Sequence, residues 1–343
     1  MRHSGTTLTD VARAAGVSLS TASLAFSGAG PISDATRDKV LAAAAELGYH
    51  GPNPVAASLR RGRSGVVGIV MGAAVRRAFR DPVSIQFLDG IVATLAAQGY
   101  GTLLLSTPEA QELPDALLTH GAMDAAVLTA GALTSRRTLA ALRARGVPMV
   151  QLGGTGRHGP AVRARDKQGM KLLGEHLRER GHERVAVATL PWHVEPRSGP
   201  VDLASARRAT SPITARRLDG LREAGIEPVA AWECSASLVE EGIAAGKELL
   251  AARPTALVGF TDLIAAGLLL AARDAGLAVP ADVAVAGFDG VDLPWLGEVR
   301  LTTAVQPTAD IGRLAAEAAV TLAEGGTARS VTVDVELRLG TTT

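Results

Sequence analysis

The glycines Gly154, Gly156 and Gly159 have the spacing G-x-G-x-x-G. In dinucleotide-binding enzymes this motif opens a helix whose N-terminus faces a pyrophosphate, and the chemistry is hydride transfer. Here the motif is followed by residues 160–164, which resemble another extended run rather than a helix. We therefore interpret the segment as a loop and expect no cofactor.

Other residue patterns with catalytic potential are equally weak. His176 and His182 lie six residues apart with no third ligand nearby, so a metal site is not expected. No Ser-His-Asp arrangement or pair of carboxylates stands out. Cys234 is the single cysteine and cannot form an internal disulfide. We expect that the chain is not an enzyme.

The N-terminal residues predict short helices that need one another for a core. Leu8–Ala15 has one apolar face, with Thr7 and Asp10 as a capping box and Gly16 as a stop. A second helix is predicted from Leu19 to Phe26, with Ser18 as its cap. It buries Ala22, Ala25 and Phe26 and turns its Ser and Thr side chains outward. Two short helices around this turn make a helix-turn-helix candidate.

A third helix and a linker complete this head, for which we set bounds of 1–50 and 51–64. Ser33 caps the third helix and Gly48 ends it, and its apolar stripe consists of Thr36, Val40, Ala43 and Leu47. In the linker, Asn53 and Pro54 start a helix of about eight residues, which is marginal alone in water. We expect it to order only on DNA or on its twin from a second subunit.

Charge and composition limit the class of protein. The sequence is 47% hydrophobic and has a net charge of +1. Residues 1–64 carry seven basic and four acidic side chains, so the head is +3 and the rest is −2. The asymmetry fits DNA contact or an ordinary surface. Residues 1–6 lack the apolar stretch of a secretory signal, and no run spans a bilayer. We expect a cytoplasmic protein with no membrane role.

From residue 65 to 343 apolar strand-like runs alternate with helical stretches, which is typical of α/β folds with parallel sheets. The predicted strands are Val66–Val70, Thr102–Leu105, Ala125–Leu128, Pro148–Leu152, Arg184–Ala188, Leu257–Phe260 and Val283–Gly287. The predicted helices are Ile85–Ala97, Thr138–Ala144, Gln168–Glu179, Leu238–Ala251 and Asp262–Ala275. A crossing back near Leu301–Val305 would make two hinged lobes, whose cleft lies beyond the carboxyl ends of the strands.

The head resembles that of the lactose-repressor (LacI/GalR) family of transcription regulators. The match consists of Leu8–Ser18, Ser20–Ser23, Ser33–Val40, Leu47–Tyr49 and Pro52–Asn53. It continues in the body at Glu175–Leu177, Gly181–His182, Pro254–Ala256, Asp262–Gly267, Val279–Val283, Gly287–Asp289 and Leu301–Thr303. The resemblance implies a helix-turn-helix head and a two-lobed body like that of periplasmic binding proteins. It also implies an operator-binding regulator, usually a repressor, that responds to a small molecule.

The resemblance implies roles for named residues of the head. Base reading falls on Leu19, Ser20 and Leu24, and the third is usually arginine in the family. Leucine there can offer only apolar contact, for instance to a thymine methyl group, or it is buried against the third helix. Phosphate contacts fall on Thr21, Ser23 and Arg37. Leu59 matches the leucine that wedges into the minor groove, and its alternative is a core leucine of the body.

In the body the resemblance implies an effector site. Arg217 would donate a forked set of bonds to the effector, Asp289 would accept bonds from hydroxyl or amine groups, and Thr261 and Gln306 would fill the rim. For Asp289 a turn or helix cap is an alternative. A sugar effector is weakened because Gly153–Gly154 stands where an aspartate is common. No aromatic residue lies between Cys234 and Leu238, where a stacking ring is common.

Three expectations concern partners and alternatives. We expect a homodimer on a near-palindromic operator, without a tetramerising heptad helix after Leu339. A periplasmic solute-binding protein would share the body, but it needs an export signal and no head, so residues 1–61 argue against it. The long segment Pro191–Pro212 either reshapes the mouth of the pocket or forms a surface loop.

Overall fold

The computed structural model describes residues 6–27, 30–51, 62–72, 78–106, 116–129, 135–192, 197–203 and 211–343. The chain forms two compact units, Met1–Gly65 and Val66–Thr343, which are called here the head and the body. Residues 52–61, which include Leu59 and the expected linker helix, lie outside the described residues.

The head contains the three predicted helices, α1 (Leu8–Ala14), α2 (Leu19–Ser27) and α3 (Asp34–Glu46). Their caps are as predicted. The Thr7 hydroxyl accepts a bond from the Asp10 backbone N–H, and the Asp10 carboxylate accepts one from the Thr7 N–H. Gly16 has φ +63° and Gly48 has φ +62°, the left-handed conformation that lets the chain leave a helix.

A small shared core holds the head together. Its buried members are Val11, Ala12, Ala15, Ala22, Ala25, Val40, Ala43 and Ala44. The half-buried Phe26 packs edge-on against Tyr49, with ring centroids 5.4 Å apart. Leu47, which we assigned to the apolar stripe, is 39% exposed, because it caps the C-terminus beyond the last turn of α3.

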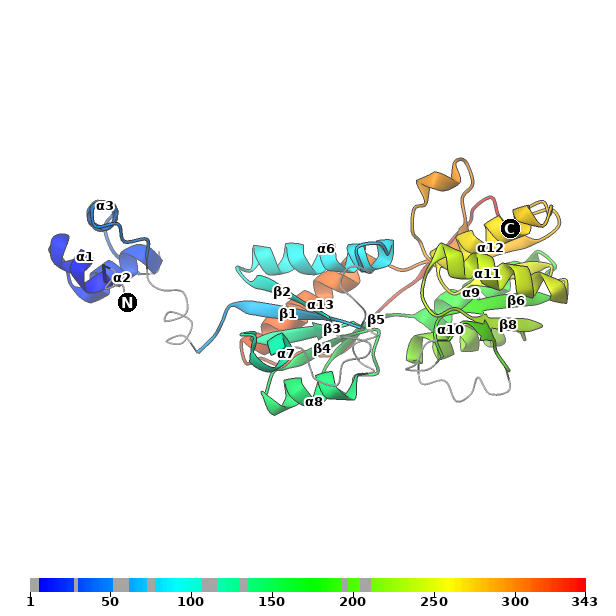
Figure 1. The fold of residues 1–343 in the computed structure, drawn as a ribbon, viewed down its shortest axis with the longest axis horizontal. Helices are drawn as coiled ribbons and strands as arrows, with labels where there is room; N and C mark the ends of the chain where they lie inside the picture. The colour runs from blue at the N-terminus through cyan, green and yellow to red at the C-terminus, as the bar shows by residue number, and fades with distance from the viewer. Residues whose placement is uncertain are drawn as a thin grey trace. The chain divides into compact units, whose positions relative to one another are not determined.

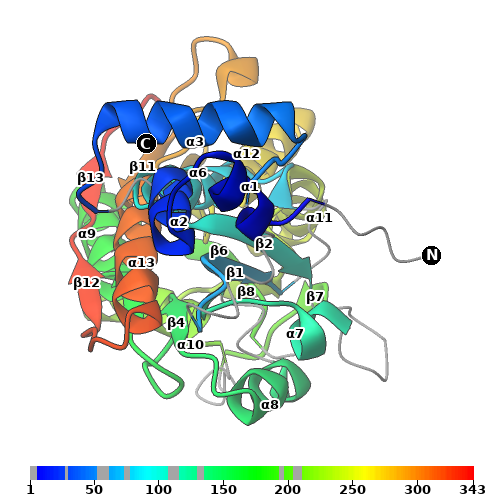
Figure 2. The same cartoon turned by 90° about the vertical axis from the view of Figure 1, so that its left-hand side faces the viewer.

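The first lobe of the body is built on a parallel six-stranded sheet with the order β12-β5-β4-β3-β1-β2. Its strands are β1 (Val66–Met71), β2 (Gly101–Ser106), β3 (Ala125–Leu128), β4 (Met149–Leu152), β5 (Ala161–Ala164) and β12 (Val331–Val333). Its helices are α6 (Pro82–Ala97), α7 (Ala116–His120), α8 (Arg136–Ala144) and α13 (Thr308–Ala323). Helix α6 covers one face of this sheet and α8 the other (Figures 1 and 2).

The second lobe is built on a seven-stranded sheet with the order β13-β11-β10-β9-β6-β8-β7. Its strands are β6 (Val185–Thr189), β7 (Gly199–Pro200), β8 (Ala230–Glu233), β9 (Ala256–Gly259), β10 (Ala284–Asp289), β11 (Thr302–Val305) and β13 (Glu336–Arg338). The edge strands β7 and β13 are antiparallel to their neighbours, and the others are parallel. Its helices are α9 (Asp166–Glu179), α10 (Pro212–Glu223), α11 (Val239–Leu249) and α12 (Asp262–Asp274), with short 3₁₀ turns at Leu250–Ala252 and Pro294–Leu296.

The two-lobed α/β architecture confirms the predicted fold class, and the crossing between the lobes differs in one respect. We expected the chain to cross back near Leu301–Val305. Strand β11 instead stays in the second sheet, where Thr303 pairs with Gly287 of β10 and Arg338 of β13. The return follows β11, since α13 and β12 belong to the first lobe.

The structure can be compared with the sequence predictions for two further segments, the glycine motif at 154–159 and Pro191–Pro212. The glycine motif runs into strand β5 rather than a helix, as predicted from residues 160–164. Within Pro191–Pro212 the described residues include the buried Trp192 and the edge strand β7, so this part does more than cover the surface. Residues 193–196 and 204–210 lie outside the description.

Candidate functional site

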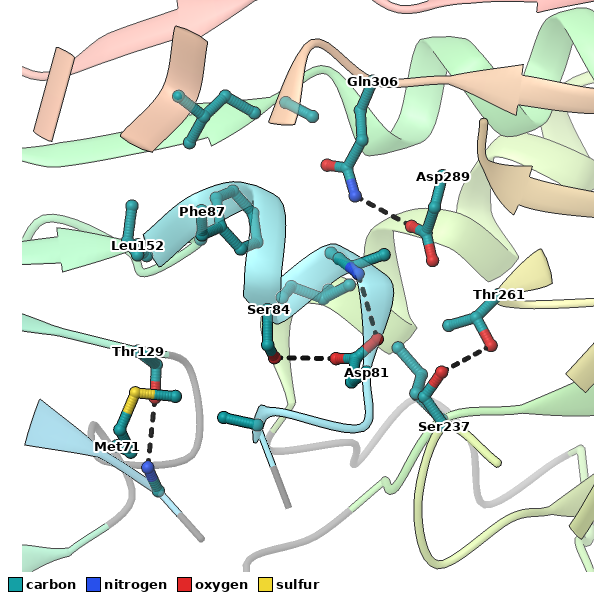
Figure 3. A pocket seen from close by; sticks show the side chains of 18 of the residues that line it. Met71, Asp81, Ser84, Phe87, Thr129, Leu152, Ser237, Thr261, Asp289 and Gln306 are labelled. Atoms are coloured by element: carbon teal, nitrogen blue, oxygen red, sulfur yellow. Dashed lines mark hydrogen bonds between the residues drawn. The ribbon is translucent and has the colours of Figure 1, made fainter. Parts of the chain in front are cut away.

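A cavity of about 390 Å³ lies within the body and has the size of a small-molecule site. Residues at or just after the carboxyl ends of strands from both sheets line it, among them Met71, Thr129, Leu152, Asp289 and Gln306 (Figure 3). This is where open α/β sheets bind ligands. The predicted position of the site, beyond the carboxyl ends of the strands, agrees with this cavity.

The first lobe gives the cavity an apolar wall. Helix α6 contributes Phe87, Leu88 and Ile91 from the face that packs on the sheet. The remaining apolar side chains from this lobe are Ile69, Met71, Ala78, Val83, Leu152, Val162, Ala164 and Ile311. These apolar side chains can bury a hydrocarbon or ring surface, while the same lobe also contributes the polar Asp81, Ser84, Thr129 and Arg163 to the lining.

Arg217 anchors the opposite wall from helix α10 and is 3% exposed. Its Nε donates to Asp166 Oδ1 at 3.1 Å, its Nη1 to the Phe260 carbonyl, and its Nη2 to Asp289 Oδ1 at 3.3 Å. The guanidinium carbon lies 3.6 Å from the centre of the Phe288 ring. Three of the five N–H groups of the guanidinium therefore bind protein atoms, and the planar group is fixed in place.

Asp289 ends strand β10 and is 4% exposed. Its Oδ1 accepts from Gln306 Nε2 at 2.8 Å and from Arg217. Burial raises the pKa of this carboxyl well above its usual range. Arg217 acts in the opposite direction, and the charges of Asp262 and Asp81 raise the pKa further. Its φ of +117° is unusual for a residue other than glycine.

Thr261 and Gln306 complete the polar wall. Thr261 is the N-cap of α12, where its hydroxyl accepts from the Ile264 backbone N–H at 3.2 Å and from the Ser237 hydroxyl at 2.9 Å. Gln306 directs its amide N–H to Asp289 (Figure 3). All four residues assigned by resemblance, Arg217, Asp289, Thr261 and Gln306, thus line one cavity.

Asp81 is a cavity residue that the sequence interpretation missed. It is the N-cap of α6, where it accepts from the Val83 backbone N–H at 3.2 Å and from the Ser84 hydroxyl at 2.7 Å. Burial raises the pKa of its carboxyl, although these hydrogen bonds oppose the shift. The pair Asp81-Pro82 is a standard helix start, which would have placed the beginning of α6 before Ile85.

The cavity also holds an internal ion cluster. Asp166 lies at the start of α9, and one of its carboxylate oxygens accepts a hydrogen bond from Nε of Arg217. Its other oxygen accepts from both Nε and Nη2 of Arg216, at 3.1 and 3.0 Å. Asp166 is 3% exposed and was not singled out from the sequence. Its charge is therefore fully used within the protein.

Two other buried titratable groups, the carboxyl of Asp262 and the thiol of Cys234, support the structure around the cavity. Asp262 accepts from the Thr303 hydroxyl and the Val291 N–H, and burial raises its pKa to about 7. Burial likewise raises the pKa of the Cys234 thiol to about 12, so it is not a nucleophile at neutral pH. Among the described residues no group of three or more His, Cys, Asp or Glu side chains could hold a metal ion.

The head presents its second helix to solvent at its N-terminal end. Leu19 is 52% exposed, and Ser20 is also exposed. The Ser18 hydroxyl contacts those of Ser20 and Thr21 at 2.7 and 2.8 Å, which orders this end. Such an end offers hydroxyl and backbone N–H groups to phosphates or base edges.

The other head residues assigned to DNA are partly buried. Thr21, Ser23, Leu24 and Arg37 all have intermediate exposure. Leu24 lies close to Gly30, where an added methyl group would come within 2.9 Å of its side chain. The Arg37 Nε is buried and has no hydrogen-bond partner within the described part of the chain. The structure keeps both the buried and the base-facing interpretation of Leu24 open.

Two known protein families match separate parts of the chain, one within the head and one within the body. Residues 7–53 match the sequence profile of a family described as bacterial regulatory proteins, lacI family. Residues 175–343 match that of the periplasmic binding protein-like domain. Among the described residues, no helix combines the length and the apolar character that a bilayer crossing requires.

Full-length similarities extend these matches. An HTH-type transcriptional regulator of Mycobacterium tuberculosis is 31% identical over 98% of this chain and 96% of that protein. The crystal structure of the lac repressor dimer bound to operator and the anti-inducer ONPF has a TM-score of 0.78 and 25% identity, covering 98% of this chain and 99% of that one. A complex of the transcriptional regulator CelR with cellobiose has a TM-score of 0.68 and 26% identity, covering 98% and 100%. The relatives are regulators and not enzymes, as predicted for this chain.

Proposed function

The chain belongs to the LacI family of bacterial regulatory proteins, which are DNA-binding transcriptional regulators, and from this premise we propose that it is a cytoplasmic, effector-controlled repressor. It binds a near-palindromic operator as a homodimer. A small molecule in the cavity of the body changes the operator affinity. The observation that carries the proposal is this cavity, which polar side chains from both lobes line in a chain that also has a helix-turn-helix head.

On the operator, the exposed end of α2 enters the major groove. Leu19 and Ser20 face base edges there, and Leu24 adds an apolar contact such as one to a thymine methyl group. Thr21, Ser23 and Arg37 bind phosphates, which fix the register of the head without reading sequence. Leu59 wedges into the minor groove at the operator centre. The hydroxyl cluster around Ser18 and the exposure of Leu19 support this assignment.

Arg37→Ala is expected to weaken binding to operator and to random DNA by similar factors, because a phosphate contact carries no sequence information. The slope of log affinity against log salt should become shallower by about one. Fluorescence anisotropy on both duplexes at several salt concentrations measures this. Arg13→Ala is the matched control, since Arg13 is an exposed head arginine that forms an ion pair with Asp10. A loss confined to the operator would contradict the phosphate role.

In the body, the effector binds between the apolar wall of the first lobe and the polar wall of the second. Asp289, Thr261 and Gln306 contact it, and Arg217 holds Asp289 in place and offers its remaining N–H groups. A ligand that touches both lobes stabilises one relative arrangement of them and shifts the population between DNA-binding states. The similar regulator CelR was solved in a complex with cellobiose, and the lac repressor dimer was solved bound to operator and the anti-inducer ONPF, so similar proteins bind small molecules.

We expect a dimer in solution and on DNA. The linker helix expected from the sequence would be about eight residues long and marginal alone in water, and a near-palindromic site presents two equivalent half-sites. Light scattering at micromolar concentration should give twice the mass of 35.1 kDa, and DNA titration should give two chains per site. A monomer that binds one chain per site would contradict the dimeric mechanism.

The experiment that tests the function as a whole is selection of DNA from a random pool by the full-length protein. We expect a sequence with two inverted half-sites, and its affinity should exceed that of random DNA by at least about a thousandfold. Placed upstream of a reporter gene, this sequence should lower expression when the protein is present. Enrichment of no sequence, or activation of the reporter, would contradict the proposal.

A further inference from the structure

We infer that the ligand of the cavity is an organic cation, with an apolar body against the first lobe and a protonated nitrogen between the carboxylates of Asp81 and Asp289. This inference rests on the proposed function, because it names the chemical class of the effector for the same cavity. Asp81 comes from the first lobe and Asp289 from the second, and Figure 3 shows both facing the cavity.

The first argument is the free oxygen of Asp289. Both of its hydrogen bonds, from Arg217 and from Gln306, arrive at Oδ1. Its Oδ2 receives none from the described residues, although the side chain is 4% exposed and lines the cavity. Asp289 lines the cavity, so this carboxylate oxygen can accept a hydrogen bond from a ligand N–H.

The second argument is the balance of charge. The Arg217 guanidinium is shared between Asp166, Asp289 and a backbone carbonyl, and Asp166 is also bound by Arg216. Asp81 forms no ion pair with any residue that the structure describes. Arg163, the other cationic residue of the lining, donates to the Gly154 carbonyl. Asp81 is therefore a lining carboxylate without a cationic partner among the described residues, and a ligand cation could supply one.

The third argument is the direction of the hydrogen bonds around the cavity. The Ser84, Ser235 and Ser237 hydroxyls donate to Asp81, Glu241 and Thr261, and the Gln306 amide donates to Asp289. Each of the three serine hydroxyls therefore donates within the protein, and its oxygen can still accept a hydrogen bond. An ammonium group has three donors and no acceptor, so it complements such a wall. A polyol would bury hydroxyl groups against Phe87 and Leu152, where they find no partner.

Isothermal titration calorimetry of the full chain without DNA tests the ligand class. The probes are butylamine, hexylamine and 4-phenylbutylamine, the alcohol of each, 4-phenylbutyrate and cellobiose. We expect the amines to bind more tightly as the apolar part grows, and each to exceed its alcohol on the order of tenfold or more. The inference is overturned if the alcohols or cellobiose match the amines, or if no amine binds more tightly than about millimolar.

Variants assign the binding to the two carboxylates. Asp81→Asn and Asp289→Asn should each weaken binding of 4-phenylbutylamine about tenfold or more, because each removes a charged acceptor. Asp89→Asn is the matched control, since Asp89 lies on the same helix as Asp81 but is exposed. Circular dichroism melts show that the variants are folded. Unchanged binding in both folded variants would overturn the inference.

A pH series adds a readout that a structural role would not produce. Asp289 faces Arg217 of α10, Asp262 of α12, Asp81 of α6 and the uncharged Gln306. Burial raises the pKa of Asp289 in the free protein, and a bound cation favours the ionised form. Amine affinity should rise as the pH is raised from acidic values and then level off, and Asp289→Asn should flatten this rise. A wild-type affinity that falls with rising pH below the pKa of the amine itself would count against the inference.

These experiments distinguish a failure of the proposed ligand class from a failure of the proposed regulator function. Selection of an operator by the same preparation tests the regulator without any ligand. If an operator is selected and cellobiose binds while amines do not, the ligand class is wrong and the regulator stands. If amines bind but no sequence is selected, the regulator is wrong and the ligand class stands.

Discussion

Arg217→Ala is expected to lower the free energy of unfolding of the body by about 3–5 kcal/mol, the cost of removing one partner from a buried ion pair. The substitution leaves Asp166 and Asp289 buried, and Asp289 then has no cation among the described residues. It also removes the group stacked on Phe288. Thermal melts followed by circular dichroism should show the transition of the body lowered by roughly 10 °C. The effector response should be lost in the same variant.

The matched control for this prediction is Arg222→Ala on the same helix. Arg222 binds Glu227, whose side chain is 63% exposed, so its loss should cost less than about 1 kcal/mol. Arg217→Lys keeps the charge but not the fork, and it should fall between the wild type and Arg217→Ala. At a temperature below the melt, Arg217→Ala should still bind operator almost as the wild type does, because the head is a separate compact unit. A stable Arg217→Ala protein that keeps its effector response would contradict the assigned role of this residue.

Leu59→Ser is expected to collapse the ratio of operator affinity to random-DNA affinity on the order of thirty- to a hundredfold, equivalent to about 2–3 kcal/mol. A leucine wedge offsets the unstacking of a base step by apolar burial and by the contacts that a bent duplex permits. Non-specific binding depends on charge, so it should keep its strength and its salt slope. Anisotropy on both duplexes gives the ratio, and the effector dependence should shrink with it.

The alternative for Leu59 is a core residue of the body, which predicts a lower melting temperature and equal weakening on all DNA. A lowered melt with an unchanged affinity ratio would therefore refute the wedge. Leu41→Ser is the matched control, because Leu41 is a 42% exposed leucine on helix α3 of the head. It should leave the ratio near the wild-type value.

The elements of the head could be predicted almost to the residue because their signals are local. The Thr7 and Asp10 capping box and the glycines at positions 16 and 48 act within one helical turn. Leu47 was the exception, since its spacing continued the stripe while the helix had already ended. In the body, α10 was missed because Arg216 and Arg217 interrupt its apolar spacing. Among the described residues, the carboxylates that pair with them are Asp166 and Asp289, which lie far away in sequence.

The cavity was predicted only in outline for the same reason. Its position beyond the strand ends follows from parallel α/β folds in general. That Arg217 binds three protein groups, and that Asp81 and Asp289 line one cavity, depends on how the fold brings together residues up to about two hundred positions apart. No periodic pattern encodes such contacts. They decide which atoms a ligand meets.

Control of the operator from the cavity is the central claim, and one measurement tests it most directly. Operator affinity of the full chain is measured by anisotropy with and without the small-molecule fraction of the cells in which the protein is native. The same titration is made on Ala236→Trp, whose indole would fill the cavity that Ala236 lines. We predict a change of about tenfold or more for the wild type, within the usual range of allosteric coupling, and little change for the folded variant. An operator affinity that ignores the fraction, or a variant that responds as the wild type does, would contradict this account.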